Sequence, residues 1–173
     1  MGTMDDKAFQ ELWEKVSDGM RHGAGQVLEA FFPKIRDSVR ALNASNVYWL
    51  HDQPQDLRTS TRVFICSPSG LGKMRIELKS TEKEDPTWSH KLSLIVTPWD
   101  DVAEVKLEVL KDETEEERFV GMALRLRDGD GITLLPERNS LGHGGVRIID
   151  GKSEQYDEPQ QFTASVLEAL GRR

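Results

Sequence analysis

The chain has 173 residues, of which 37% are hydrophobic and 31% charged, which is enough apolar content for one domain with a buried core. Its formal net charge of −7 argues against nonspecific binding to nucleic acid or to anionic lipid. No apolar run approaches the roughly 18 residues of a membrane helix, and the single cysteine, Cys66, excludes an internal disulfide. We therefore expect one cytoplasmic domain over residues 1–173, in which residues 1–4 are an expression remnant or a disordered start.

Two amphipathic helices are predicted before any strand. The first begins at Asp5, whose carboxylate can cap it, and carries an apolar stripe at i, i+3 and i+4 spacing. Three glycines predict a turn near residues 19–24. A second apolar stripe runs from Val27 to Leu42 and contains Pro33, so this helix should kink or restart at the proline.

The middle of the chain alternates apolar and polar residues, which predicts seven or eight strands. The links between them are too short for crossover helices, so consecutive strands should pair antiparallel as a meander. Alternation also places each apolar set on one face, which helices at the chain ends should cover. The predicted strands span 47–51, 61–66, 74–79, 91–97, 104–110, 120–127, 132–135 and 146–149.

The last part of the chain combines turns with one helix. Asp128-Gly129 is typical of a hairpin turn, and residues 136–145 are predicted to form a polar, glycine-bearing loop. Pro159 suits the first position of a short helix that ends near Gly171. The sequence thus predicts an α+β fold: two N-terminal helices, a mainly antiparallel meander sheet, and one C-terminal helix packed on it.

The loop at residues 136–145 is one candidate binding site. It holds His143 among glycines, where backbone N–H groups can approach a ligand and an imidazole can move protons near neutral pH. Arg138 lies in the same loop and is the second ligand candidate. The alternative is a flexible hairpin with an incidental exposed histidine. The four histidines and the cysteine lack metal-ligand spacing, so no metal and no cofactor are predicted.

Charge is unevenly distributed along the chain. Residues 100–117 contain nine acidic residues and two basic ones, whereas residues 58–83 contain six basic residues and two acidic ones. The acidic part can attract a basic partner, and the basic part can attract an anionic ligand. The alternative is that adjoining strands simply complement each other in charge. The residues predicted to contact a partner are Trp99, Asp100, Asp101, Glu113, Glu115 and Glu116; for the tryptophan, folding over the edge of the core is the alternative.

The order helix, sheet, helix with an acidic surface loosely resembles small bacterial chaperone-like and inhibitor proteins. It also resembles helix-grip ligand-binding folds, which usually begin with a strand and end with a longer helix. Our leading hypothesis is a noncatalytic, cytosolic protein-interaction module whose partner is another protein, of basic character. The alternatives are a small-molecule-binding domain with a pocket between sheet and helices, and an enzyme that uses His143. A homodimer through an edge strand is left open.

Overall fold

The structure, a computed structural model, describes residues 5–24, 26–52, 58–80, 88–111, 117–134 and 140–171. Helices stand at both ends of the chain, and strands lie between them. The helical elements are α1 (Asp6–Ala24), the 3-10 helix η1 (Gln26–Phe31), α2 (Phe32–Ala41), the 3-10 helix η2 (Trp99–Asp101) and α3 (Pro159–Gly171). The strands are β1 (Asn46–Asp52), β2 (Arg58–Cys66), β3 (Gly70–Ser80), β4 (Trp88–Pro98), β5 (Val102–Lys111), β6 (Glu117–Leu126), β7 (Gly131–Leu134), β8 (Ser140–Ile149) and β9 (Lys152–Tyr156).

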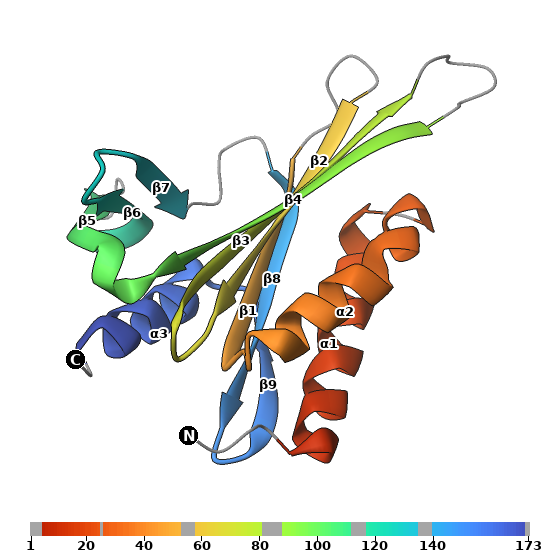
Figure 1. The fold of residues 1–173 in the computed structure, drawn as a ribbon, viewed down its shortest axis with the longest axis horizontal. Coiled ribbons are helices and arrows are strands. Elements are labelled where there is room, and N and C mark those ends of the chain that lie inside the picture. The colour runs from red at the N-terminus through yellow and green to blue at the C-terminus, as the bar shows by residue number, and fades with distance from the viewer. Residues whose placement is uncertain are drawn as a thin grey trace.

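A six-stranded antiparallel sheet, in the order β4-β3-β2-β1-β8-β9, forms the centre of the molecule (Figure 1). The first four strands form a meander, and β8 returns to pair with the free side of β1. The intervening strands β5, β6 and β7 form a separate sheet. Among the described strands, β4 and β9 are therefore the two edges of the large sheet.

Each face of the large sheet carries its own apolar core. α1 and α2 pack on one face, and α3 together with the small sheet lies on the other (Figure 1). Successive residues of a strand alternate between these cores, so Trp49 faces the helix pair while Tyr48 and Leu50 face α3. The apolar stripe predicted for α1 is buried in the first core: Phe9, Leu12, Trp13, Val16 and Met20. The predicted α+β class, with helices at both ends packed on an antiparallel sheet, is confirmed.

The N-terminal helices differ from the prediction at one position. α1 continues through the turn expected at residues 19–24. Glycine is a weak helix former, but at position 19 it admits the Trp49 indole, because a Cβ atom there would lie 2.5 Å from Trp49 Cζ2. The restart expected at Pro33 is confirmed, since η1 gives way to α2 with this proline in the first turn of α2.

The single meander predicted across residues 88–127 is wrong at one junction. β4 pairs with β3 but not with β5, because η2 turns the chain out of the large sheet. Trp99 in η2 is 3% exposed, and its indole N–H donates to the Ser67 carbonyl at 2.9 Å. This contact fixes the turn beside the end of β2, and β5 then starts the small sheet by pairing with β6.

The prediction of a loop at residues 136–145 is wrong for residues 140–145, which lie in a strand. β8 begins at Ser140, and its glycines pair with β1. β9 was not predicted. It follows a two-residue turn in which Asp150 and Gly151 have φ of 49° and 76°, the arrangement of a type I′ hairpin.

No helix in the described part of the chain is both long and apolar enough to cross a membrane.

Candidate functional site

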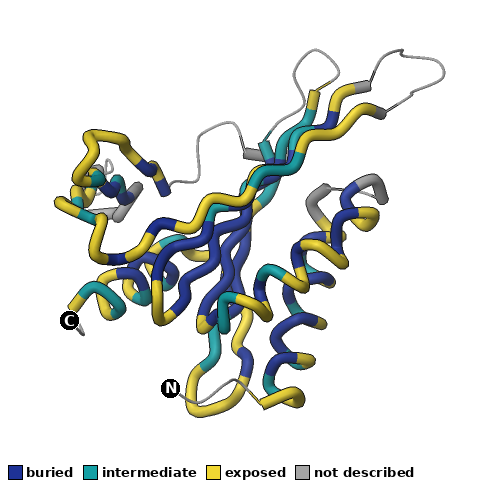
Figure 2. The backbone as a smooth tube through the Cα atoms, viewed as in Figure 1, coloured by how far each residue is buried: buried dark blue, intermediate teal, exposed yellow. Residues whose placement is uncertain are grey.

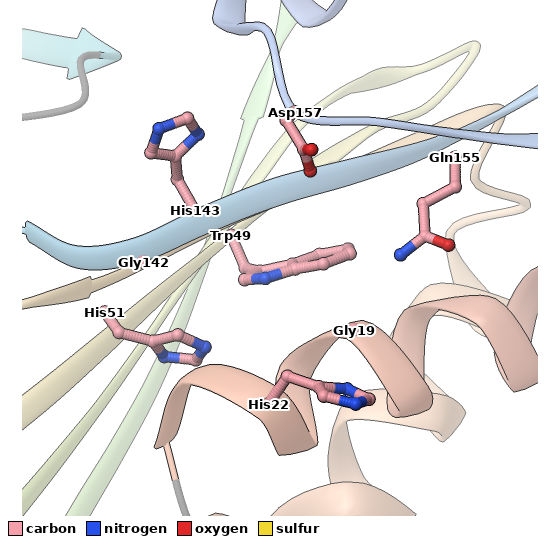
Figure 3. A pocket seen from close by; sticks show the side chains of 8 residues that line it. All are labelled: Gly19, His22, Trp49, His51, Gly142, His143, Gln155 and Asp157. Carbon is pink, nitrogen blue, oxygen red and sulfur yellow. The ribbon is translucent and has the colours of Figure 1, made fainter.

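A pocket of about 260 Å³ lies at the start of β8, between α1 and the large sheet (Figure 3). We call it the β8 pocket. Three of the four histidines, although distant in sequence, contribute to it. Its lining residues are Gly19, His22, Trp49, His51, Gly142, His143, Gln155 and Asp157.

Glycines on two elements make room for aromatic rings beside this pocket. A Cβ atom at Gly144 would lie 2.8 Å from Trp49 Cζ2, so the indole fits between β8 and α1 only because both elements carry glycine there. On the opposite face, a Cβ atom at Gly145 would lie 2.2 Å from Tyr156 Cζ. The packing of two rings thus accounts for glycines that were also candidates for a ligand loop.

His51 is the most distinctive polar group of the β8 pocket. It is 2% exposed; its Nδ1 lies 3.0 Å from Thr61 Oγ1, and its Nε2 has no hydrogen-bond partner among the described residues. Burial lowers the pKa of this imidazole to about 4, although the neighbouring Asp52 acts in the opposite direction. The ring is therefore neutral at physiological pH, and its Nε2 is a buried polar atom that the described residues leave unsatisfied.

The other two histidines do not converge on His51. His22 Nδ1 lies 2.8 Å from the Asp18 carbonyl oxygen; because a carbonyl only accepts, Nδ1 carries the proton. His143 points to the opposite side of β8 (Figure 3), and its ring centroid is 6.2 Å from that of Tyr48. Within the described ranges, no three His, Cys, Asp or Glu side chains are placed to share a metal ion.

A second hollow, of about 250 Å³, lies over β3 and β4 on the sheet face opposite α1 and α2. We call it the basic groove. Its position follows from strand alternation, because Met74 and Ile76 of β3 point into the helix-side core and the residues between them point away. The residues that line the groove are Lys73, Arg75, Glu77, Lys91, Ser93 and Ile95.

Positive charge exceeds negative charge in the basic groove. Arg75 Nε lies 2.9 Å from Glu77 Oε1, whereas neither Lys73 nor Lys91 forms an ion pair with a described residue. Burial lowers the pKa of Lys73, and the guanidinium groups of Arg62 and Arg75 lower it further. An anionic group in the groove would therefore be attracted to Lys73 and would relieve its repulsion from these neighbours.

β4, beside the groove, is an edge strand that exposes apolar side chains. Leu94, Ile95 and Val96 have exposed fractions of 38%, 62% and 42%, and Figure 2 shows exposure along most of the strand. The prediction that helices cover the alternating apolar face is wrong here. α1 packs mainly against β1, β8 and β9, toward the edge of the sheet that is opposite β4. The helix layer meets β4 near the start of the strand, where Phe31 lies beside His90.

The residues predicted to bind a partner or ligand fall into three groups. Trp99 is buried, so it covers the edge of the core, as the alternative reading proposed. Asp100, Asp101 and His143 are exposed. The remaining candidates, Glu113, Glu115, Glu116 and Arg138, lie outside the described residues.

Sequence reasoning did not single out the exposed edge of β4 or Lys91. The available signal was the apolar run at residues 94–96, because a strand with one solvent face should place a polar residue between Leu94 and Val96. Ile95 breaks this pattern. A run of this type indicates either burial on both faces or an exposed apolar surface, and only the position of β4 in the sheet decides between them.

No protein-family model matches the chain, and neither the curated proteins nor the solved structures include a significant match to it.

Proposed function

We propose that this protein is a noncatalytic protein-interaction module, and that a segment of its partner adds as a strand to the outer edge of β4. The exposed run Leu94 to Val96 on an edge strand is the observation that supports this most strongly. Natural proteins usually protect such edges with charges, prolines or covering elements, and a long apolar edge marks a site of pairing. Strand addition is an established mode of peptide recognition.

The main chain of β4 is arranged to receive such a strand. The main-chain N–H of Trp99 donates to the Ser69 carbonyl at 3.4 Å. Because hydrogen-bonded pairs alternate along antiparallel strands, this bond indicates which residues of β4 bond to β3. Odd-numbered residues of β4 then bond to β3, and even-numbered residues direct their N–H and C=O groups outward. Leu94 and Val96 thus offer outward main-chain groups together with exposed apolar side chains.

The surface that β4 and the basic groove offer is apolar and basic. The prediction of a basic partner rests on Asp100 and Asp101, which are exposed, and on Glu113, Glu115 and Glu116, which lie outside the described ranges. It stays a prediction. A cytosolic location belongs to the proposal as well. It is supported by Cys66, the one cysteine of the chain, which is a buried free thiol.

The proposal is tested with a labelled peptide as long as β4, eleven residues, in which valine alternates with threonine. Leu94→Pro should weaken its binding about tenfold in fluorescence anisotropy, because proline removes an outward N–H and leaves the pairing with β3 intact. Leu94→Thr keeps the N–H and is the matched control, with a smaller loss. Equal affinities of wild type and Leu94→Pro would contradict strand addition, provided that circular dichroism shows both to be folded.

A small-molecule-binding role at the β8 pocket is the second candidate, favoured by the unpartnered Nε2 of His51. A screen of small polar molecules by NMR should then yield binders that shift the ring ¹⁵N signals of His51. His51→Phe should abolish their binding. Binders that leave these ring signals unchanged would count against the role. Use of His143 in an enzyme stays a prediction.

A further inference from the structure

We infer that the segment received by β4 alternates acidic and apolar residues, with its carboxylates over the basic groove. This inference rests on the proposed function of β4 as the docking edge. It adds the chemistry of the partner, which the exposed edge alone does not specify.

A strand that adds to β4 extends both faces of the large sheet, because side chains alternate in every strand. Its residues on the helix side would lie next to Leu94 and Val96, which are exposed and apolar. Its residues on the other side would lie next to Lys91, Ser93 and Ile95. One half of the incoming side chains therefore meets an apolar surface, and the other half meets the basic groove.

The second half meets a surplus of positive charge. The groove is lined by three cations and one carboxylate, and that carboxylate, Glu77, is already paired with Arg75. Lys73 and Lys91 are the groups left to bind an anion. The lowered pKa of Lys73 agrees with a site that gains when a negative charge arrives. Opposite charges on adjacent strands stabilise pairing, so an acidic residue fits beside Lys91 of β4, and Lys73, one strand further on β3, adds positive charge to the same groove.

A second copy of this chain fits the same edge poorly. A twofold pairing of two β4 strands keeps the same face of each copy on the same side, so both basic grooves would adjoin. Lys91 of each copy would then lie on one of the two paired strands, and like charges on adjacent strands are destabilising. Nucleic acid offers negative charge, but it has neither a peptide main chain that can pair with β4 nor apolar residues for Leu94 and Val96. The occupant that satisfies both faces is an acidic and apolar extended segment of another protein.

Three labelled peptides of eleven residues separate this inference from the function on which it rests. In each, valine alternates with a second residue, which is glutamate, threonine or lysine, and all carry the same soluble tail. Fluorescence anisotropy at low salt should show the glutamate peptide binding about two- to fivefold more tightly for each carboxylate placed in the groove than the threonine peptide. The lysine peptide should bind most weakly, and added salt should reduce these differences.

Charge variants of the protein locate the effect. Lys91→Glu should lower the affinity for the glutamate peptide and raise it for the lysine peptide. Lys73→Met, which removes the charge and keeps most of the side-chain volume, should weaken the binding of the glutamate peptide and of no other peptide. Lys34→Glu makes the same change of charge at an exposed position of α2 and is the matched control. It should leave the order of the peptide affinities unchanged.

Each outcome decides between the two claims. Equal affinities for the glutamate and threonine peptides would overturn the acidic partner and leave strand addition standing. Tighter binding of the lysine peptide would also overturn it and would favour a basic partner. If none of the three peptides binds, the docking function of β4 fails and this inference fails with it.

Discussion

Tyr156 lies so close to its cross-strand partner Gly145 that a Cβ atom on the glycine would be 2.2 Å from the phenol ring. The ring cannot easily retreat, because its hydroxyl donates a hydrogen bond to buried Asn46. We therefore expect Gly145→Ala to lower the free energy of unfolding by about 1–3 kcal/mol in urea denaturation. Gly171→Ala is the control, since nothing lies within 4 Å of an added Cβ there. A loss no larger than that of the control would show that the ring shifts freely.

The hydrogen bonds around Asn46 connect the large sheet to α3. Its Oδ1 accepts from the Tyr156 hydroxyl, and its Nδ2 donates to Ser165 Oγ at 2.7 Å. Tyr156→Phe would leave the Oδ1 atom, in a residue that is 1% exposed, without this donor. The expected loss is about 1–3 kcal/mol in thermal or urea unfolding. Ser165→Ala, at a half-buried position, should lower the free energy of unfolding by less than Tyr156→Phe does. A larger loss for Ser165→Ala would mean that Asn46 Oδ1 has another donor.

Much of the fold could be predicted from local pattern because its helices and most of its strands follow simple periods. The elements that were missed depend on contacts between distant residues. Gly19 leaves room on α1 for the indole of Trp49, which lies 30 positions away in sequence. Gly144 and Gly145 lie in a strand that pairs with β1 and β9, and they leave space for rings from those two strands. Glycine alone predicts a loop, and only its neighbours in space show the opposite.

The sites were harder to predict for the same reason. The alternation of β4 correctly indicated a strand, but whether Leu94 is covered depends on where α1 packs, which no local pattern encodes. Lys73 and Lys91 are 18 positions apart and line one groove only because β3 pairs with β4. His22, His51 and His143 line one pocket because β8 returns to pair with β1 and α1 packs against both strands. That return has no signature in the sequence between them.

Cys66 should be chemically inert while the protein is folded. Its side chain is 1% exposed, and burial raises the pKa of the thiol to about 12. The thiolate, which is the reactive form, is therefore scarce at neutral pH. Labelling with a thiol reagent should follow the rate of unfolding and should accelerate in urea in step with the loss of circular dichroism. Rapid labelling in native buffer would instead indicate local opening at the end of β2.

His51 should make the stability of the protein depend on pH. Burial holds the pKa of its imidazole at about 4 in the folded chain, against an ordinary value of 6.5 when it is exposed. Between these two pH values the unfolded chain binds a proton that the folded chain does not bind. The contribution of His51 to the free energy of unfolding should therefore be constant above pH 6.5 and should fall as the pH decreases toward 4. The total loss should be up to about 3 kcal/mol.

Urea denaturation at several pH values between 5 and 7 measures this dependence, in a range where few carboxylates titrate. His51→Gln should lower the stability at every pH but flatten its slope, because the residue that titrates has been removed. His22→Gln, which removes a histidine at an exposed position, is the comparison variant. If His51→Gln retains the full slope, the proton is bound elsewhere, and the Nε2 atom is not the isolated neutral group that the β8 pocket proposal requires.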